Sequence, residues 1–169
     1  MGSAKCQAGL TKLELSVVVA VIALAWIAAF DRLRDLQEMG EKTAVEMTVS
    51  NIRSGLRFEM AERIMSGREG SIGELADSNP VRWLDKLPEA YLGEFPMVPP
   101  SFPPGSWYFD TGHKELHYRP ALGRYLECEQ CERVQGNATL VWHITLAGNP
   151  MFGRGDTVRV VAVAPYRWF

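Results

Sequence analysis

Residues 8–30 read "AGLTKLELSVVVAVIALAWIAAF" and form the most apolar segment of the chain. No charged residue lies between Leu15 and Phe30. Residues 10–30 are long enough to span a bilayer as a helix, which takes about 20 residues. Glu14 lies near the start of this run, and a carboxylate in hydrocarbon costs roughly 2.5–3.5 kcal/mol on insertion scales. We therefore expect another group to offset this cost, and the identity of that group bears on function.

The residues before the apolar run are small and polar. An ordinary signal peptide carries its small-residue cleavage site after the apolar segment. Here Ala8 and Gly9 precede that segment. Cleavage at this point would leave the apolar run on the mature protein, as an anchor rather than as a discarded signal.

A helical pattern continues beyond the apolar run. No proline occurs in residues 1–79, and apolar residues recur every three or four positions, which indicates one buried helix face. This stripe consists of Val45, Val49, Ile52, Leu56, Met60 and Ile64. Gly67 and Gly70 are candidate stop signals. The sequence therefore predicts one helix from Leu10 to about Ser66, which is apolar on all sides at first and amphipathic later.

Residues 71–104 are expected to be irregular, with at most short helices. Asn79 followed by Pro80 is a good helix start, as the N-cap and the first helical residue. The run "FPMVPPSFPPG" is rich in proline, which disfavours both helix and central strand. Its spacing also fits a PxxP ligand, but a loop over the domain surface is the favoured interpretation.

The remaining residues alternate as strands do. The segments "SWYFD" and "ELHYR" flank the turn "TGHK" and predict a β-hairpin. The segments "ATLVWHITLA" and "TVRVVAVA" are rich in β-branched and aromatic residues. Four antiparallel strands with one apolar face need a cover, which the stripe from Val45 to Ile64 can supply. The predicted fold class is α+β: a long N-terminal α-helix packed on a small antiparallel β-sheet.

Length and charge narrow the possible classes of protein. The 169 residues indicate one domain plus an appendage. The formal net charge is −2, and no basic tract resembles a nucleic-acid footprint. No nucleic acid is therefore expected among the partners.

The cysteines are Cys6, Cys128 and Cys131. The last two form a C-x-x-C pair, which can be a redox site, half of a zinc site or a structural disulfide. Three glutamates crowd the pair, and acidic neighbours disfavour the thiolate that a redox site needs. They are Glu127, Glu129 and Glu132. Zinc would need two further ligands, for which His117 and His143 match no tight motif. A structural disulfide in an exported domain is the favoured interpretation.

The three histidines, His113, His117 and His143, are interpreted as structural residues. Nothing in the sequence places a nucleophile beside a base, and no G-x-S-x-G or comparable element is present. The last loop offers only Asp156 as a calcium ligand, which is too few hard oxygen ligands. The sequence therefore predicts no catalytic residue, no metal site and no cofactor, and the protein is expected not to be an enzyme.

Gly9, the run "LTKLEL" with Glu14 at the fifth place after Gly9, and the apolar helix together resemble the type IV prepilin-like family. That family comprises pilins, minor pilins and the pseudopilins of type II secretion. The resemblance implies a division of the chain into four parts. They are a leader peptide (1–9), a transmembrane and filament-core helix (10–30), an amphipathic helix continuing into the globular domain (31–70), and a globular pilin-like domain with an antiparallel sheet (71–169).

The resemblance also implies roles for single residues. Gly9 would be the last leader residue, recognised by a prepilin peptidase, and Leu10 would become the N-methylated N-terminus. Glu14 would face the free α-ammonium group of a neighbouring subunit, which would neutralise it when subunits stack. The simpler alternative places Glu14 at headgroup level, as a flank of the anchor. Lys12 and Asp31 depart from the family, which usually has an apolar residue and a proline at these places.

The resemblance implies a non-enzymatic pseudopilin subunit of type II secretion, cleaved after Gly9 and assembled through its N-terminal helix. Its partners would be other pilin or pseudopilin subunits, the prepilin peptidase/methyltransferase, the inner-membrane assembly platform and membrane lipid. It would cross the bacterial inner membrane once, with its C-terminal domain in the periplasm. Two alternatives are open: a minor type IV pilin for pilus assembly, adhesion or DNA uptake, and a single-pass membrane-anchored binding domain that does not polymerise.

Overall fold

The computed structural model describes residues 11–134, 136–148 and 156–169. The chain divides into two compact units, Met1–Gln37 and Glu38–Phe169. The helix α1 (Lys12–Met65) contributes to both units. It ends one residue before the predicted end at Ser66, so the prediction of a single long helix is confirmed for the described residues.

The described part of the first unit is the N-terminal portion of α1. Its apolar side chains are exposed on every side, with exposed fractions of 76% for Leu13, 59% for Trp26 and 56% for Phe30. Trp26 and Phe30 lie one turn apart, with 5.7 Å between their ring centroids. No side chain of this portion is buried within the described structure.

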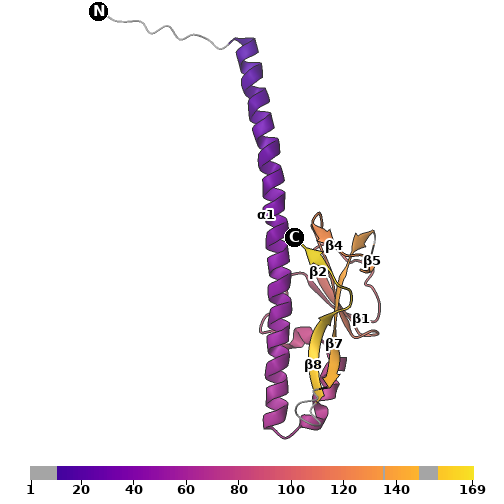
Figure 1. The fold of residues 1–169 in the computed structure, drawn as a ribbon. Coiled ribbons are helices and arrows are strands. Elements are labelled where there is room, and N and C mark those ends of the chain that lie inside the picture. The colour runs from indigo at the N-terminus through magenta and orange to yellow at the C-terminus, as the bar shows by residue number, and fades with distance from the viewer. Residues whose placement is uncertain (1–10, 135, 149–155) are drawn as a thin grey trace, which may run out of the picture. The chain divides into compact units, whose positions relative to one another are not determined.

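The second unit contains a five-stranded sheet in the order β1-β2-β3-β7-β8 (Figure 1). Its strands are β1 (Tyr91–Phe95), β2 (Ser106–Asp110), β3 (Glu115–Arg119), β7 (Leu140–Gly148) and β8 (Asp156–Ala162). β2, β3, β7 and β8 are antiparallel neighbours, which confirms both predicted strand pairs. Two small ribbons complete the unit, β4 (Leu126–Glu127) with β9 (Arg167–Trp168) and β5 (Arg133–Val134) with β6 (Asn137–Ala138).

The strand β1 corrects the prediction for residues 71–104. This segment was expected to hold no strand, yet β1 pairs with β2 in parallel, so the sheet is mixed rather than purely antiparallel. The segment "YLGEF" has no clear strand signature, because Gly93 interrupts it at φ 112° and the register shifts between Tyr91 and Glu94. Sequence alternation over so short and bulged a strand is weak.

The proline-rich loop after β1 covers the sheet face opposite the helix. Its Phe102 is 2% exposed and packs edge-on against Tyr108 of β2, with 4.8 Å between the ring centroids. The loop therefore lies on the domain, as predicted. Before β1, the two short helices η1 (Glu69–Asp77) and η2 (Pro80–Trp83) are both 3-10 helices. The predicted cap of η2 is confirmed, since Val81 donates its N–H to Oδ1 of Asn79 at 3.0 Å.

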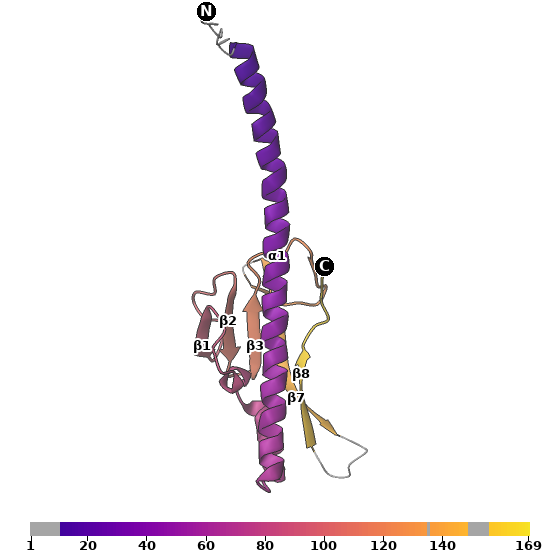
Figure 2. The ribbon, with the colours of Figure 1, turned by 90° about the vertical axis from the view of Figure 1, so that its left-hand side faces the viewer.

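The second half of α1 packs across the inner face of the sheet (Figure 2). The buried helix residues are Val45, Val49, Ile52 and Leu56. They meet an aromatic layer in which Trp107 and Trp142 stack with 5.5 Å between their rings. Met60 is partly buried, but Ile64 is 48% exposed, so its place in the stripe is wrong. Ile64 lies in the last turn of α1, where Arg63 makes the contact with η1.

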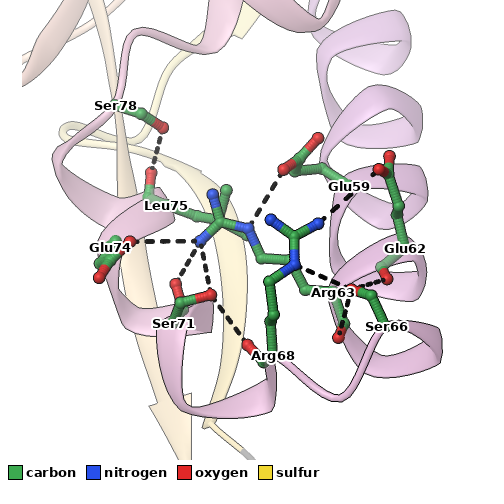
Figure 3. Close-up of polar contacts among 9 residues, drawn as sticks. All are labelled: Glu59, Glu62, Arg63, Ser66, Arg68, Ser71, Glu74, Leu75 and Ser78. Atoms are coloured by element: carbon green, nitrogen blue, oxygen red, sulfur yellow. Dashed lines mark hydrogen bonds and ion pairs between the residues drawn. The ribbon is translucent and has the colours of Figure 1, made fainter.

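Arg63 ties the end of α1 to η1 (Figure 3). Its Nε lies 3.1 Å from Oε1 of Glu59, and its Nη1 donates to the backbone oxygen of Ser71 and lies 3.9 Å from Oε2 of Glu74. Gly67 follows the helix at φ 70°, a left-handed conformation that favours glycine. Gly67 is therefore a helix stop, as predicted.

Candidate functional site

Gly9 and Leu10, the predicted processing residues, lie outside the described residues. Within the described residues, one helix, α1, is long and apolar enough to cross a membrane, and none of its most apolar window is buried. By length and composition, α1 could form a single membrane span.

The side chains of residues 13–30 form a continuous apolar surface around α1. Those more than half exposed include Leu13, Val17, Val21, Leu24, Ile27 and Phe30. Exposed apolar patches larger than a few hundred Å² are rare on soluble monomers and mark membrane or protein contacts. Lipid or other apolar chains would each cover such a surface.

Glu14 lies in the first turn of α1, and Thr11 caps that turn. The backbone N–H of Glu14 donates to Oγ1 of Thr11 at 3.2 Å. The spacing Thr-x-x-Glu directly before an apolar run is the capping-box pattern. The carboxylate also lies at the positive end of the helix dipole. Glu14 therefore has a local role that the sequence reasoning missed, although its pattern is readable in residues 11–14.

Glu38 of α1 is a buried carboxylate that the sequence reasoning also missed. It is 3% exposed. Its Oε1 accepts hydrogen bonds from the backbone N–H of Tyr125 at 2.8 Å and from the indole N–H of Trp168 at 3.0 Å. Glu38 lies seven residues before Val45, so it continues the buried stripe by two helical turns. That spacing is the signal that could have identified it.

Glu41 lies one turn further along α1. Its carboxylate accepts a hydrogen bond from the hydroxyl of Tyr118 at 2.7 Å. It also accepts from the backbone N–H groups of Ala121 at 2.6 Å and Leu122 at 2.9 Å. Burial, and then the hydrogen bond to Glu41, raise the pKa of Tyr118 above its ordinary value. Glu38 and Glu41 together hold the loop 120–125 against the helix.

A disulfide joins Cys128 to Cys131, with 5.5 Å between the Cα atoms. It closes a short loop that carries the exposed Glu129 between the two cysteines. Within the described residues, no three His, Cys, Asp or Glu side chains are placed to hold a metal ion. Cys6 lies outside those residues.

His117 of β3 is buried on the sheet face that points away from α1. It is 3% exposed, and its ring stacks on Tyr108 with 4.6 Å between the ring centroids. Carboxylate oxygens of Glu115 and Glu132 lie 3.5 and 3.8 Å from its ring nitrogens, without forming hydrogen bonds. Burial dominates and lowers the pKa of His117 to about 4. His117 is therefore neutral at neutral pH.

The buried His117 should make the folded protein less stable in mild acid. Between its ordinary pKa of 6.5 and about 4, the unfolded chain binds a proton that the folded chain does not. The free energy of unfolding should therefore fall by about 3 kcal/mol as the pH drops through this window. His117→Phe keeps an aromatic ring beside Tyr108 and removes the titration. Chemical unfolding at several pH values should give a flatter profile for this variant, and parallel profiles would contradict the account.

The other two histidines have structural positions. His113 lies in the turn between β2 and β3, with its Nδ1 3.0 Å from Oδ2 of Asp110, and this hydrogen bond raises the pKa of His113. Burial acts to raise the pKa of Asp110, but hydrogen bonds from His113 and Gly112 outweigh it, so the pKa is lowered. His143 of β7 lies opposite Glu115 in the sheet register. These contacts fix the β2–β3 turn and the strand pairing.

Two features of the described chain are therefore candidates for function. One is the exposed apolar helix with Glu14 as the one charged side chain among residues 13–30, and the other is the unit in which Glu38 and Glu41 join α1 to the sheet. No protein-family model, curated protein or solved structure matches the chain. Its function is therefore inferred from its own residues.

Proposed function

We propose that this chain is a non-enzymatic filament subunit, anchored in a membrane by residues 10–30 and assembled through the same helix. The observation that carries the proposal is the exposed apolar surface of α1 with one carboxylate, Glu14, at its start. Lipid can cover this surface before assembly, and the helices of neighbouring copies can cover it afterwards. The filament we favour is a type II secretion pseudopilus in a bacterial inner membrane, with a minor type IV pilin as the alternative.

Cleavage after Gly9 supplies the cation that this proposal requires. It frees an α-ammonium group on residue 10, and such a group has an ordinary pKa of about 7.7–8.0 and is mostly protonated at neutral pH. In a stack of helices, this cation can lie beside Glu14 of the next copy. A buried ion pair adds little net stability, but a wrong register leaves both charges unpaired, so the pair selects one stagger.

The capping interaction of Thr11 favours a second candidate function. A membrane anchor that never polymerises could carry Glu14 only to start its helix, with no partner charge. The two candidates differ in processing, because only the filament subunit needs a free α-ammonium group next to the helix.

Gly9→Val is expected to block processing. A side chain larger than hydrogen hinders the entry of an extended backbone into a narrow protease cleft, while the apolar run that directs insertion is unchanged. The intact mass of the membrane-bound protein should lack residues 1–9 for the wild-type chain and should retain them for Gly9→Val. Gly2→Val is the matched control and should be cleaved normally. A wild-type chain that keeps residues 1–9 in cells containing the peptidase would refute the proposal.

Cysteine alkylation gives an independent readout of the same experiment. Cleavage removes Cys6, and the disulfide protects Cys128 and Cys131. The mature chain should therefore bind no alkylating reagent before reduction, whereas the uncleaved variant should bind one. Free alkylation of Cys128 and Cys131 in the exported protein would contradict the disulfide.

A further inference from the structure

A groove in the second unit runs between α1 and the outer strand of the sheet. It has a volume of about 440 Å³. Its lining residues are Arg53, Leu56, Arg57, Met60, Thr157, Val158, Arg159 and Val160. Leu56, Val158 and Val160 are buried, whereas the three arginines are exposed. β8 is the last strand in the sheet order, so its outer edge pairs with no other described strand. The groove therefore has an apolar base, an unpaired strand edge along β8 and positive charge from its three arginines.

The arginines of this groove have no ion pair with any described residue. Arg53 and Arg57 are four residues apart in α1, so two like charges lie on the same helix face, which is unfavourable. Arg63, two turns after Arg57 in the same helix, is in contrast fully engaged with two glutamates (Figure 3). A locally unfavourable arrangement without a compensating partner is typical of a functional surface. An acidic partner would compensate the repulsion between these two arginines.

The chain itself carries an acidic segment of suitable form. Residues 127–132 hold Glu127, Glu129 and Glu132 without a lysine or arginine between them. The disulfide closes the middle of this segment, so its shape is fixed before any binding, which reduces the entropy lost on contact. Glu129 is exposed and has no ion pair with any described residue. The segment is thus a pre-shaped acidic loop with a free carboxylate.

The acidic loop and the arginine groove are different surfaces of the same unit. The loop follows β4, whereas the groove borders β8, and Figure 1 shows these two strands at different ends of the second unit. A contact between two different surfaces of identical chains is heterologous and leaves one free surface of each kind at the ends. Repetition of such a contact builds an open filament when the rotation does not close into a ring.

We propose that the groove lined by Arg53, Arg57 and Arg159 binds the acidic loop 127–132 of a second copy of this chain. This inference rests on the proposed function, since it names the contact made between the folded units of filament neighbours. The argument for the occupant is charge complementarity between the exposed arginines of the groove and the exposed Glu129 and Glu132 of the loop, since Glu127 already pairs with Arg167 of its own chain. The proposed contact between the N-terminal helices of neighbouring copies and the proposed contact between groove and loop involve different residues. A variant can therefore lose one of them and keep the other.

Cross-linking of the full-length membrane protein tests the contact. Arg57→Lys introduces an amine into the groove, and a carbodiimide joins amines to carboxylates that touch them. Membranes from cells expressing isotopically light and heavy copies together should yield a peptide joining position 57 of one copy to the segment 127–132 of another. Arg68→Lys is the matched control, because Arg68 is exposed but pairs with Glu62 of its own chain. Absence of the mixed peptide, or joining of position 57 only to another protein, would overturn the proposal.

Charge reversal tests the same contact without a reagent. Arg57→Glu should lower the yield of filaments at least tenfold, as should Glu129→Arg, and the chain carrying both changes should recover most of the wild-type yield. Yields are compared at equal membrane abundance. Single reversals that assemble like the wild type would overturn the groove contact while leaving the filament proposal intact. If neither the wild-type chain nor Arg57→Lys forms filaments but Arg57→Lys gives the mixed cross-link, the contact stands and the filament proposal fails.

Discussion

Glu14→Gln is expected to leave the chain folded and inserted in the membrane but to exclude it from filaments. Glutamine serves the capping box as well as glutamate does, so the start of α1 is retained. Only the negative charge is lost. In the proposed filament, the α-ammonium group of the neighbour would then be unpaired in a low dielectric, a loss of about 3–5 kcal/mol for each contact. The measurement is the fraction of protein in sedimented filaments, at equal membrane abundance.

Two further variants separate the charge of Glu14 from its capping role. Thr11→Val removes the cap, which costs about 1 kcal/mol at the helix start, and keeps the charge. It should still enter filaments. Glu14→Asp keeps the charge on a shorter side chain and should be intermediate. Normal assembly of Glu14→Gln together with failure of Thr11→Val would assign Glu14 to the cap alone and would refute the charge pair.

Glu38→Ala is expected to destabilise the second unit strongly. It removes the acceptor for the N–H of Tyr125 and for the indole N–H of Trp168 and leaves two buried donors without a partner. Each such donor costs about 1–3 kcal/mol, so the free energy of unfolding should fall by about 2–6 kcal/mol. Urea unfolding of the full chain in detergent micelles, followed by near-ultraviolet circular dichroism, measures this loss.

Two control variants show whether the loss comes from the buried acceptor. Glu38→Gln keeps an oxygen in place and should lose clearly less than Glu38→Ala. Glu46→Ala removes a glutamate from the same helix whose side chain is 58% exposed, together with its pair to Lys42 at 3.8 Å. An exposed pair of this kind contributes about 0.3–0.5 kcal/mol. Equal losses for Glu38→Ala and Glu46→Ala would show that the hydrogen bonds of Glu38 add nothing.

The elements with a strong sequence period could be predicted well. The apolar stripe from Val45 to Leu56 predicted the buried face of α1, because burial on one face imposes a helical spacing over several turns. The two strand pairs followed from alternation and turn residues in the same way. The strand β1 was not predictable by this means. Gly93 and a register shift break its alternation, and its pairing with β2 depends on a proline-rich loop whose path is set by tertiary contacts.

The candidate sites divide along a similar line. Glu14 stands out in the sequence because a charge in an apolar run is rare, but its hydrogen bond with Thr11 was overlooked. Glu38 resembles an ordinary surface glutamate, because its partner Trp168 is remote in the sequence. The groove around Arg57 could not be predicted either, since it requires β8 to lie beside α1. Contacts between segments that are far apart in the sequence produce no recognisable spacing of residues along the chain.

The hydrogen bond between Glu38 and Trp168 also constrains the order in which the chain folds. The two residues are 130 positions apart, so the helix emerges from the ribosome long before the strand that completes its burial. Closing so large a loop carries an entropy cost that local contacts do not, which makes this contact a late event in folding. Until it forms, Oε1 of Glu38 lacks the indole N–H, and only the N–H of Tyr125 and water can bind it. A chain interrupted before β9 would therefore lack both the indole that completes the burial of Glu38 and the strand that pairs with β4.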